Sequence, residues 1–196
     1  DIYAAGAVQL GDEDDYFQSG LFTIARRRIL WLLILVLANG LTTKVIAMND
    51  QILKEIVLLA AFIPLLIGTG GNVGAQSSTV VIRGLSTQKL KSLGAFKAVI
   101  KESITGALLG ILMILVVFPF AWWLGKGPLI ASAVGISLIS ITTLAATAGA
   151  ILPLLFDRMG LDPALMSSPF ITTVTDIAGV FIYLNTANWL LNSSIL

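Results

Sequence analysis

The sequence contains neither cysteine nor histidine, and charged residues make up only 12% of its 196 positions. The missing thiols and imidazoles exclude thiolate chemistry, structural zinc and imidazole ligation of a metal. Any metal ion that this chain handles is therefore a hard cation that meets oxygen ligands. No nucleophile–base pair and no metal-ligand set is present, so we expect no enzyme activity. The net charge of +1 gives no reason to expect nucleic acid binding.

Hydrophobic residues, in contrast, make up 57% of the chain, and the mean hydropathy is +0.94. Soluble domains have a lower apolar fraction and about twice this share of charge. The apolar runs are long and continuous rather than alternating, which favours membrane-spanning helices over a β-barrel. We therefore expect an all-α protein that lies in the lipid bilayer of a cell membrane.

Five apolar segments predict five transmembrane helices, because each meets the requirement of about 20 residues for crossing a bilayer. They cover approximately residues 27–48, 52–82, 96–124, 128–156 and 163–191. Residues 1–25 are polar and acidic, and we expect a cytosolic, partly helical connecting segment there, followed by a transmembrane domain over 26–196. The second helix is expected to be interrupted, because it contains Pro64 and the pair Gly70 and Gly71.

Lysine and arginine are distributed unequally between the two ends of these predicted helices. With five crossings, nine basic residues share one side: Arg26, Arg27, Arg28, Arg83, Lys89, Lys91, Lys97, Lys101 and Arg158. Only Lys44, Lys54 and Lys126 lie on the other side. The positive-inside rule then predicts a cytoplasmic N-terminus and an external C-terminus. An odd helix number excludes two equal inverted halves in one chain, so a symmetric site requires a second copy.

Asp176 is the acidic residue that lies deep in an apolar run, about 14 Å in from Ser167 at the helical rise per residue. An ionised carboxylate at this depth usually marks an ion or substrate path. Its helical face carries mostly small or hydroxylic residues, namely Ser168, Pro169, Thr172, Thr173 and Gly179, and continues outward through Val180 and Tyr183. The alternatives are an interhelical hydrogen bond or a buried ion pair. No lysine or arginine lies at a similar depth to complete an ion pair.

The run that follows Pro64 combines glycines with two amide side chains, Asn72 and Gln76, one helical turn apart. Irregular backbone at membrane depth is tolerated where it lines a cavity or is buried in protein, and exposed carbonyls there can meet an ion or its waters. Close packing through the small residues Gly71 and Gly74 is the alternative, and the two can coexist. A phosphate-binding loop is excluded because no Gly-Lys-Ser/Thr follows.

Other residues indicate where the membrane boundaries lie. Trp122 and Trp123 are typical of an outer interfacial anchor. Glu102, beside Lys101 at the start of the third helix, is interpreted as an interfacial charge or as part of a pore mouth.

These motifs resemble those of the MgtE magnesium channels. The resemblance rests on Gly70-Gly71-Asn72-Val73-Gly74-Ala75-Gln76 after the intramembrane proline, and on Asp162-Pro163-Ala164 followed by the run from Pro169 to Gly179. The lead-in up to Trp31 is similar to the segment that joins the cytosolic part to the pore in that family. The match covers essentially the whole chain.

The resemblance implies a homodimeric pore on the dimer axis, lined by the second and fifth helices. Asp176 would be the pore aspartate of each chain. Gly71, Asn72, Gly74 and Gln76 would line the pore together with Ser168, Thr172, Thr173 and Gly179. The family's cytosolic domains, an N-terminal domain and a paired CBS module, are expected to be absent apart from the connecting segment.

We therefore expect a channel in which hydrated Mg²⁺ passes Asp176, driven by the membrane potential. The sequence leaves open a secondary carrier that exchanges Mg²⁺ for Na⁺ or H⁺, because a carboxylate also binds protons. A non-conducting membrane anchor is the third reading, but it leaves Asp176 unexplained. Selectivity among Mg²⁺, Mn²⁺, Co²⁺, Ni²⁺ and Ca²⁺ is also left open.

Overall fold

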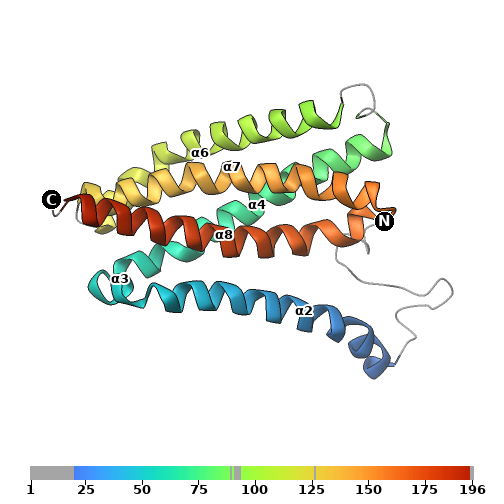
Figure 1. Ribbon diagram of the computed structural model, residues 1–196, viewed down its shortest axis with the longest axis horizontal. Coiled ribbons are helices and arrows are strands. Elements are labelled where there is room, and N and C mark those ends of the chain that lie inside the picture. Colours follow the sequence, from blue (N-terminus) through green and yellow to red (C-terminus); the bar gives the residue numbers. More distant parts are fainter. Residues whose placement is uncertain (1–19, 89, 91–93, 126, 195–196) are drawn as a thin grey trace.

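The computed structural model describes residues 20–88, 90, 94–125 and 127–194 (Figure 1). All regular secondary structure in these ranges is helical. The helices are α2 Leu21–Met48, α3 Asp50–Glu55, α4 Leu58–Ser86, α6 Ala95–Gly125, α7 Pro128–Arg158 and α8 Pro163–Ser194. Most of the expected connecting segment lies outside the described residues. Helix α2 begins at Leu21 and runs without a break past residue 25.

Four helices in the described ranges are long and apolar enough to cross a membrane: α4, α6, α7 and the Phe170–Asn192 part of α8. This confirms the all-α membrane class. Helix α2 has 28 residues and contributes a shorter apolar stretch, Leu32–Met48, so a fifth crossing stays a prediction.

The expected interruption of the second spanning helix at the glycine-rich run is wrong. Helix α4 is continuous from Leu58 to Ser86, and the break in this part of the chain lies earlier, at Ile56 and Val57. Glycine lowers helix propensity, but tertiary packing supplies most of a helix's stability. Here Gly70 and Gly71 are buried between neighbouring helices, which hold the backbone in helical conformation.

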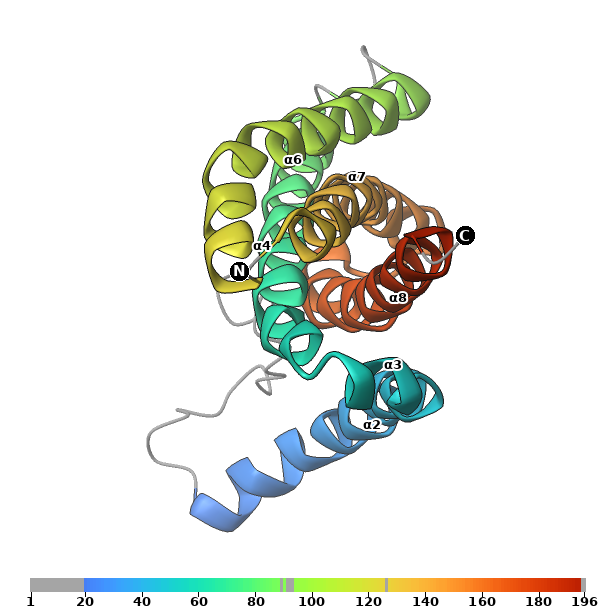
Figure 2. The ribbon, with the colours of Figure 1, turned by 90° about the vertical axis from the view of Figure 1, so that its left-hand side faces the viewer.

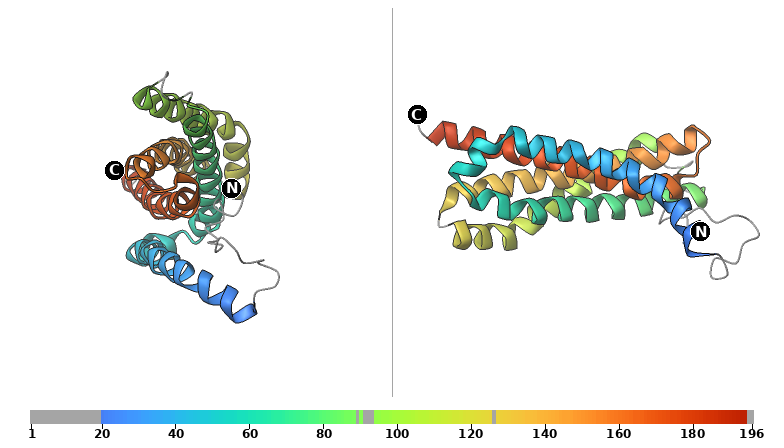
Figure 3. Two further views of the ribbon diagram at one scale, coloured as in Figure 1. Left: turned by 90° about the vertical axis from the view of Figure 1, so that its right-hand side faces the viewer. Right: turned by 90° about the horizontal axis from the view of Figure 1, so that it is seen from below.

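Helix α7 lies at the centre of the bundle and packs against α4, α6 and α8, while α4 also packs against α8. Helix α2 contacts α8, with Val45 and Ile46 near its carboxyl end packed on the apolar core. Its amino end stands away from the other helices (Figures 2 and 3). The carboxyl ends of α4 and α7 lie at the same end of the bundle as the amino ends of α2, α6 and α8 (Figure 1). We name this the basic end, because it carries Arg83, Lys101 and Arg158.

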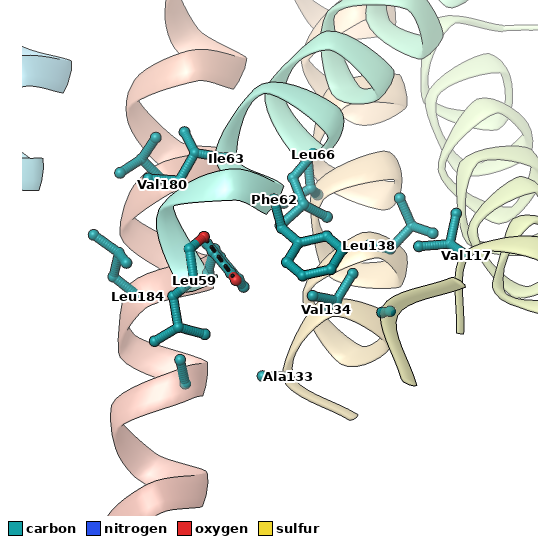
Figure 4. Close-up of a cluster of buried hydrophobic side chains, with 14 of the residues drawn as sticks. Leu59, Phe62, Ile63, Leu66, Val117, Ala133, Val134, Leu138, Val180 and Leu184 are labelled. Atoms are coloured by element: carbon teal, nitrogen blue, oxygen red, sulfur yellow. Dashed lines mark hydrogen bonds between the residues drawn. The ribbon is translucent and has the colours of Figure 1, made fainter. Parts of the chain in front are cut away.

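The apolar core occupies the opposite half of the bundle. Leu59, Phe62 and Leu66 of α4 interdigitate there with Leu138 of α7 and Leu184 of α8 (Figure 4). In a bilayer such contacts act through packing rather than through exclusion of water. The bundle is therefore held by large side chains in one half and by close contacts of small residues in the other.

Candidate ion site

Asp176 lies in α8 at the junction between these two halves. It is the only acidic residue in the described helices that lies more than ten residues from either helix end. Its side chain is half-buried. The next residue on its face, Val180, belongs to the apolar core, whereas Thr172, one turn earlier, lies at a contact with α4.

Glycines of α4 lie in close contact with α8 about one helical turn before Asp176. A β-carbon on Gly71 would lie 3.6 Å from the Thr172 Cγ2 atom, and one on Gly74 would lie 2.4 Å from the Ile171 Cγ2 atom. No larger residue fits at Gly74 without displacing Ile171. The two motifs that the sequence singled out separately are therefore adjacent in the fold.

The α4 motif divides into a buried and an exposed part. Gly71 and Gly74 are buried against neighbouring helices, which favours the packing interpretation for these two positions. Asn72 and Gln76 are exposed, one turn apart, on the side of α4 that no other described helix covers. Gly68 continues this surface by one further turn, and a β-carbon on Gly68 would have no other atom within 4 Å.

The remaining predicted residues of α8 are placed differently from one another. Thr173 is buried and Thr172 is half-buried. Gly179 is buried, and a β-carbon there would lie 3.7 Å from side chains of Ile141 in α7 and Ile67 in α4. The backbone of Ser168 is helical, but its side chain lies outside the described residues.

The expected outward continuation of the polar stripe through Val180 and Tyr183 is wrong. Both residues are buried, and Tyr183 has no exposed surface. The Tyr183 hydroxyl donates a hydrogen bond of 3.1 Å to the Leu59 carbonyl of α4 (Figure 4). Helical spacing from Asp176 placed Tyr183 on this face, but spacing alone does not reveal the acceptor on the neighbouring helix.

Within the described part of the chain, no side chain donates a hydrogen bond to the Asp176 carboxylate and no lysine or arginine pairs with it. A deeply placed carboxylate usually has a partner or faces water. The interhelical hydrogen bond and the ion pair considered for Asp176 thus receive no support. The same residues contain no group of three or more acidic side chains that could hold a metal. Among the described residues, Asp176 is thus a single unpartnered carboxylate deep within a membrane-spanning helix.

Residues 63–186 match the MgtE family, which is described as a divalent cation transporter. The chain belongs to the MgtE family. It is 37% identical over 193 residues to a magnesium transporter MgtE of Thermus thermophilus, covering 98% of this chain and 42% of the relative. It is 34% identical to the magnesium transporter MgtE of Enterococcus faecalis, covering 84% of this chain and 36% of the relative. It is 31% identical to that of Bacillus subtilis, covering 92% of this chain and 40% of the relative.

The family resemblance read from the motifs is therefore confirmed. The three relatives are named as transporters rather than enzymes, which agrees with the expectation of no enzyme activity. The chain spans about two fifths of the length of these relatives.

Proposed function

We propose that two copies of this chain form a divalent-cation channel in which hydrated Mg²⁺ passes between the two Asp176 side chains. The observation that carries this proposal is the half-buried Asp176 carboxylate, which has no partner among the described residues and lies far from the helix ends. The names of the MgtE relatives support magnesium as the transported ion.

The coordination chemistry of magnesium favours a homodimer. Mg²⁺ prefers octahedral oxygen ligands and loses water reluctantly, so one carboxylate cannot hold the bare ion. Two carboxylates related by a twofold axis could hold the hydrated ion through its waters, and the divalent charge would offset their mutual repulsion. The uncovered amides of Asn72 and Gln76 offer further polar groups on the side of α4 where a second copy could face them.

The orientation of this channel in the membrane follows from the excess of lysine and arginine at the basic end. We propose that α2 is a fifth crossing, since its 28 residues extend about 42 Å. Placing the basic end in the cytoplasm of a cell membrane puts the N-terminus inside and the C-terminus outside. The membrane potential then drives entry, with a gain of roughly 4.6 kcal/mol per 100 mV for a divalent ion.

Asp176→Asn tests this proposal because it removes the charge with little change in volume. The protein is reconstituted into liposomes that contain a fluorescent magnesium indicator, and a potassium gradient with valinomycin sets the potential. We expect Asp176→Asn to reduce the Mg²⁺ influx at least tenfold. Asp157→Asn is the matched control, because Asp157 is exposed near the end of α7. Wild-type influx in the Asp176 variant, with the control also unchanged, contradicts the assignment.

A secondary carrier that exchanges Mg²⁺ for Na⁺ or H⁺ is the second candidate function. The same lack of partners favours it, because an unpaired carboxylate is also free to bind a proton or a sodium ion. A carrier requires a coupling-ion gradient, whereas a channel requires only the electrochemical gradient of Mg²⁺ itself.

A further inference from the structure

A cleft of about 300 Å³ lies between the carboxyl end of α4 and the amino end of α6, at the basic end of the bundle. These two helices contact each other little, because α6 packs mainly on α7. They separate at this end and leave the cleft between them. Val80 and Arg83 line it from α4, and Ala98, Lys101 and Glu102 line it from α6.

The polar part of the cleft has an excess of positive charge. Arg83 and Lys101 are exposed, and neither forms an ion pair with any described residue. Glu102 is half-buried. Two cations and one carboxylate leave a charge of +1 in the cleft, which matches the single negative charge of a phosphodiester.

The remaining wall is apolar and partly open. Val80 is 58% exposed, and it lies in a helix that is long and apolar enough to cross a membrane, so its side chain is accessible to lipid. Val81 and Ala98 form the buried floor beside it. A ligand that fits this cleft therefore combines an anionic group with a hydrocarbon chain.

The depth of the cleft agrees with such a ligand. Lys101 and Trp122 both lie in α6, and at 1.5 Å per residue they are about 31 Å apart along the helix axis. The hydrocarbon core of a bilayer is about 30 Å thick, and tryptophans concentrate at its boundary. With Trp122 near one boundary, this length of α6 is enough to bring Lys101 to the level of the phospholipid phosphates at the opposite boundary.

The cleft lies away from the contact between Gly71 and Thr172, further along α4 toward the basic end. Gly71 contacts Thr172 of α8, one turn from Asp176. Val80 follows nine residues later, which places it about 180° around α4 from Gly71. An occupant of the cleft thus contacts α4 away from its contact with Thr172, one turn beyond Gln76.

We propose that this cleft binds an anionic phospholipid of the phosphatidylglycerol class. The phosphate lies between Arg83 and Lys101, and one acyl chain follows Val80 and Ala98 into the bilayer. The Glu102 carboxylate accepts hydrogen bonds from the headgroup hydroxyls. The lipid bridges α4 and α6 where the two helices have few direct contacts.

Native mass spectrometry of the purified chain in detergent tests the proposal. Dioleoyl phosphatidylglycerol is titrated against dioleoyl phosphatidylcholine, which has the same acyl chains and no net charge. We expect phosphatidylglycerol to be retained preferentially. Arg83→Gln and Lys101→Gln should each weaken its binding about fivefold, since one cation near a membrane surface contributes about that factor. Val80→Phe, which narrows the apolar wall, should weaken the binding of both lipids.

Lys97→Gln is the matched control, because Lys97 is an exposed cation one turn from Lys101 and outside the cleft lining. It should leave phosphatidylglycerol binding unchanged. An equal loss in all three charge variants would indicate a general effect of surface charge and overturn the proposal. Equal retention of the two lipids would also overturn it. Glycerol phosphate at millimolar concentration should not displace the lipid, and displacement would show a soluble phosphate site instead. All substituted side chains are exposed, and circular dichroism verifies that each variant is folded.

Discussion

Gly74 of α4 and Gly149 of α7 lie in direct backbone contact, so that a β-carbon on Gly149 would be 2.3 Å from the Gly74 carbonyl oxygen. No rotation of a side chain can relieve this overlap, because the obstructing atom belongs to the backbone. The contact lies in the half of the bundle that has few large core side chains. It therefore sets the distance between α4 and α7, and through Gly74 and Ile171 also the position of α8 beside Asp176.

Gly149→Ala should destabilise the protein, because the two helices must move apart to accept the methyl group. Overpacking of a close contact costs about 1–3 kcal/mol. Unfolding of the purified protein by SDS titration in mixed micelles measures this loss.

Gly68→Ala is the matched control for that substitution. A β-carbon on Gly68 would have no atom within 4 Å, so only the gain in helix propensity remains. This variant should be as stable as the wild type or about 0.5–1 kcal/mol more stable. Equal stability of the Gly149 and Gly68 variants would show that the contact is not tight in solution.

The position of Asp176 could be predicted from sequence, because a single charge in a long apolar run needs no knowledge of the neighbouring helices. The residues that pack against each glycine could not be predicted from the sequence. Helical periodicity places Asn72 near Gly71 on α4, but it does not say which side meets α8 and which side stays uncovered. That choice depends on the packing of Ile171 and Ile141, residues that look like ordinary lipid-facing positions in the sequence.

The continuity of helix α4 also could not be predicted from the sequence. Local propensity counts Gly70 and Gly71 as helix breakers, whereas the structure shows that their lack of side chains is what permits three helices to approach. Tyr183 is a similar case. Its hydrogen bond to the Leu59 carbonyl joins residues 124 positions apart, a separation that no periodic pattern reveals.

Tyr183→Phe should lower stability by about 0.5–1.5 kcal/mol, since it removes one buried hydrogen bond and keeps the ring packing. The change acts on the core between α4 and α8 and not on the carboxylate. SDS unfolding should therefore show the loss, while Mg²⁺ influx per folded protein stays within twofold of the wild type. Asn185→Ala, at an exposed position of the same helix, provides the control and should have little effect on stability. A tenfold loss of influx in Tyr183→Phe would indicate that this face extends the ion path after all.

Single cysteines can report which side of α4 is wet, because the chain contains none of its own. We expect Asn72→Cys and Gln76→Cys to react with a charged, water-soluble thiol reagent in liposomes. Leu112→Cys, on the exposed apolar face of α6, should not react, because a lipid-facing thiol stays protonated and shielded from the reagent. Added Mg²⁺ should slow the reaction at position 72 if this surface borders the ion path. Equal labelling at all three positions, or none at 72 and 76, would contradict a watery passage along α4.

The driving force separates a channel from a carrier. For a channel, a potential of −100 mV alone should drive Mg²⁺ accumulation of roughly 10³-fold at equilibrium, because the gain of about 4.6 kcal/mol corresponds to more than three decades in concentration. Proteoliposomes with equal pH and no sodium on either side measure this directly. Reversing the potential should reverse the flux, and imposing a sodium or proton gradient at fixed potential should leave it unchanged. The Asp176→Asn variant provides the control for leakage. Flux that requires a sodium or proton gradient would instead assign Asp176 to a coupled exchange, in which the carboxylate binds Mg²⁺ and the counter-ion alternately.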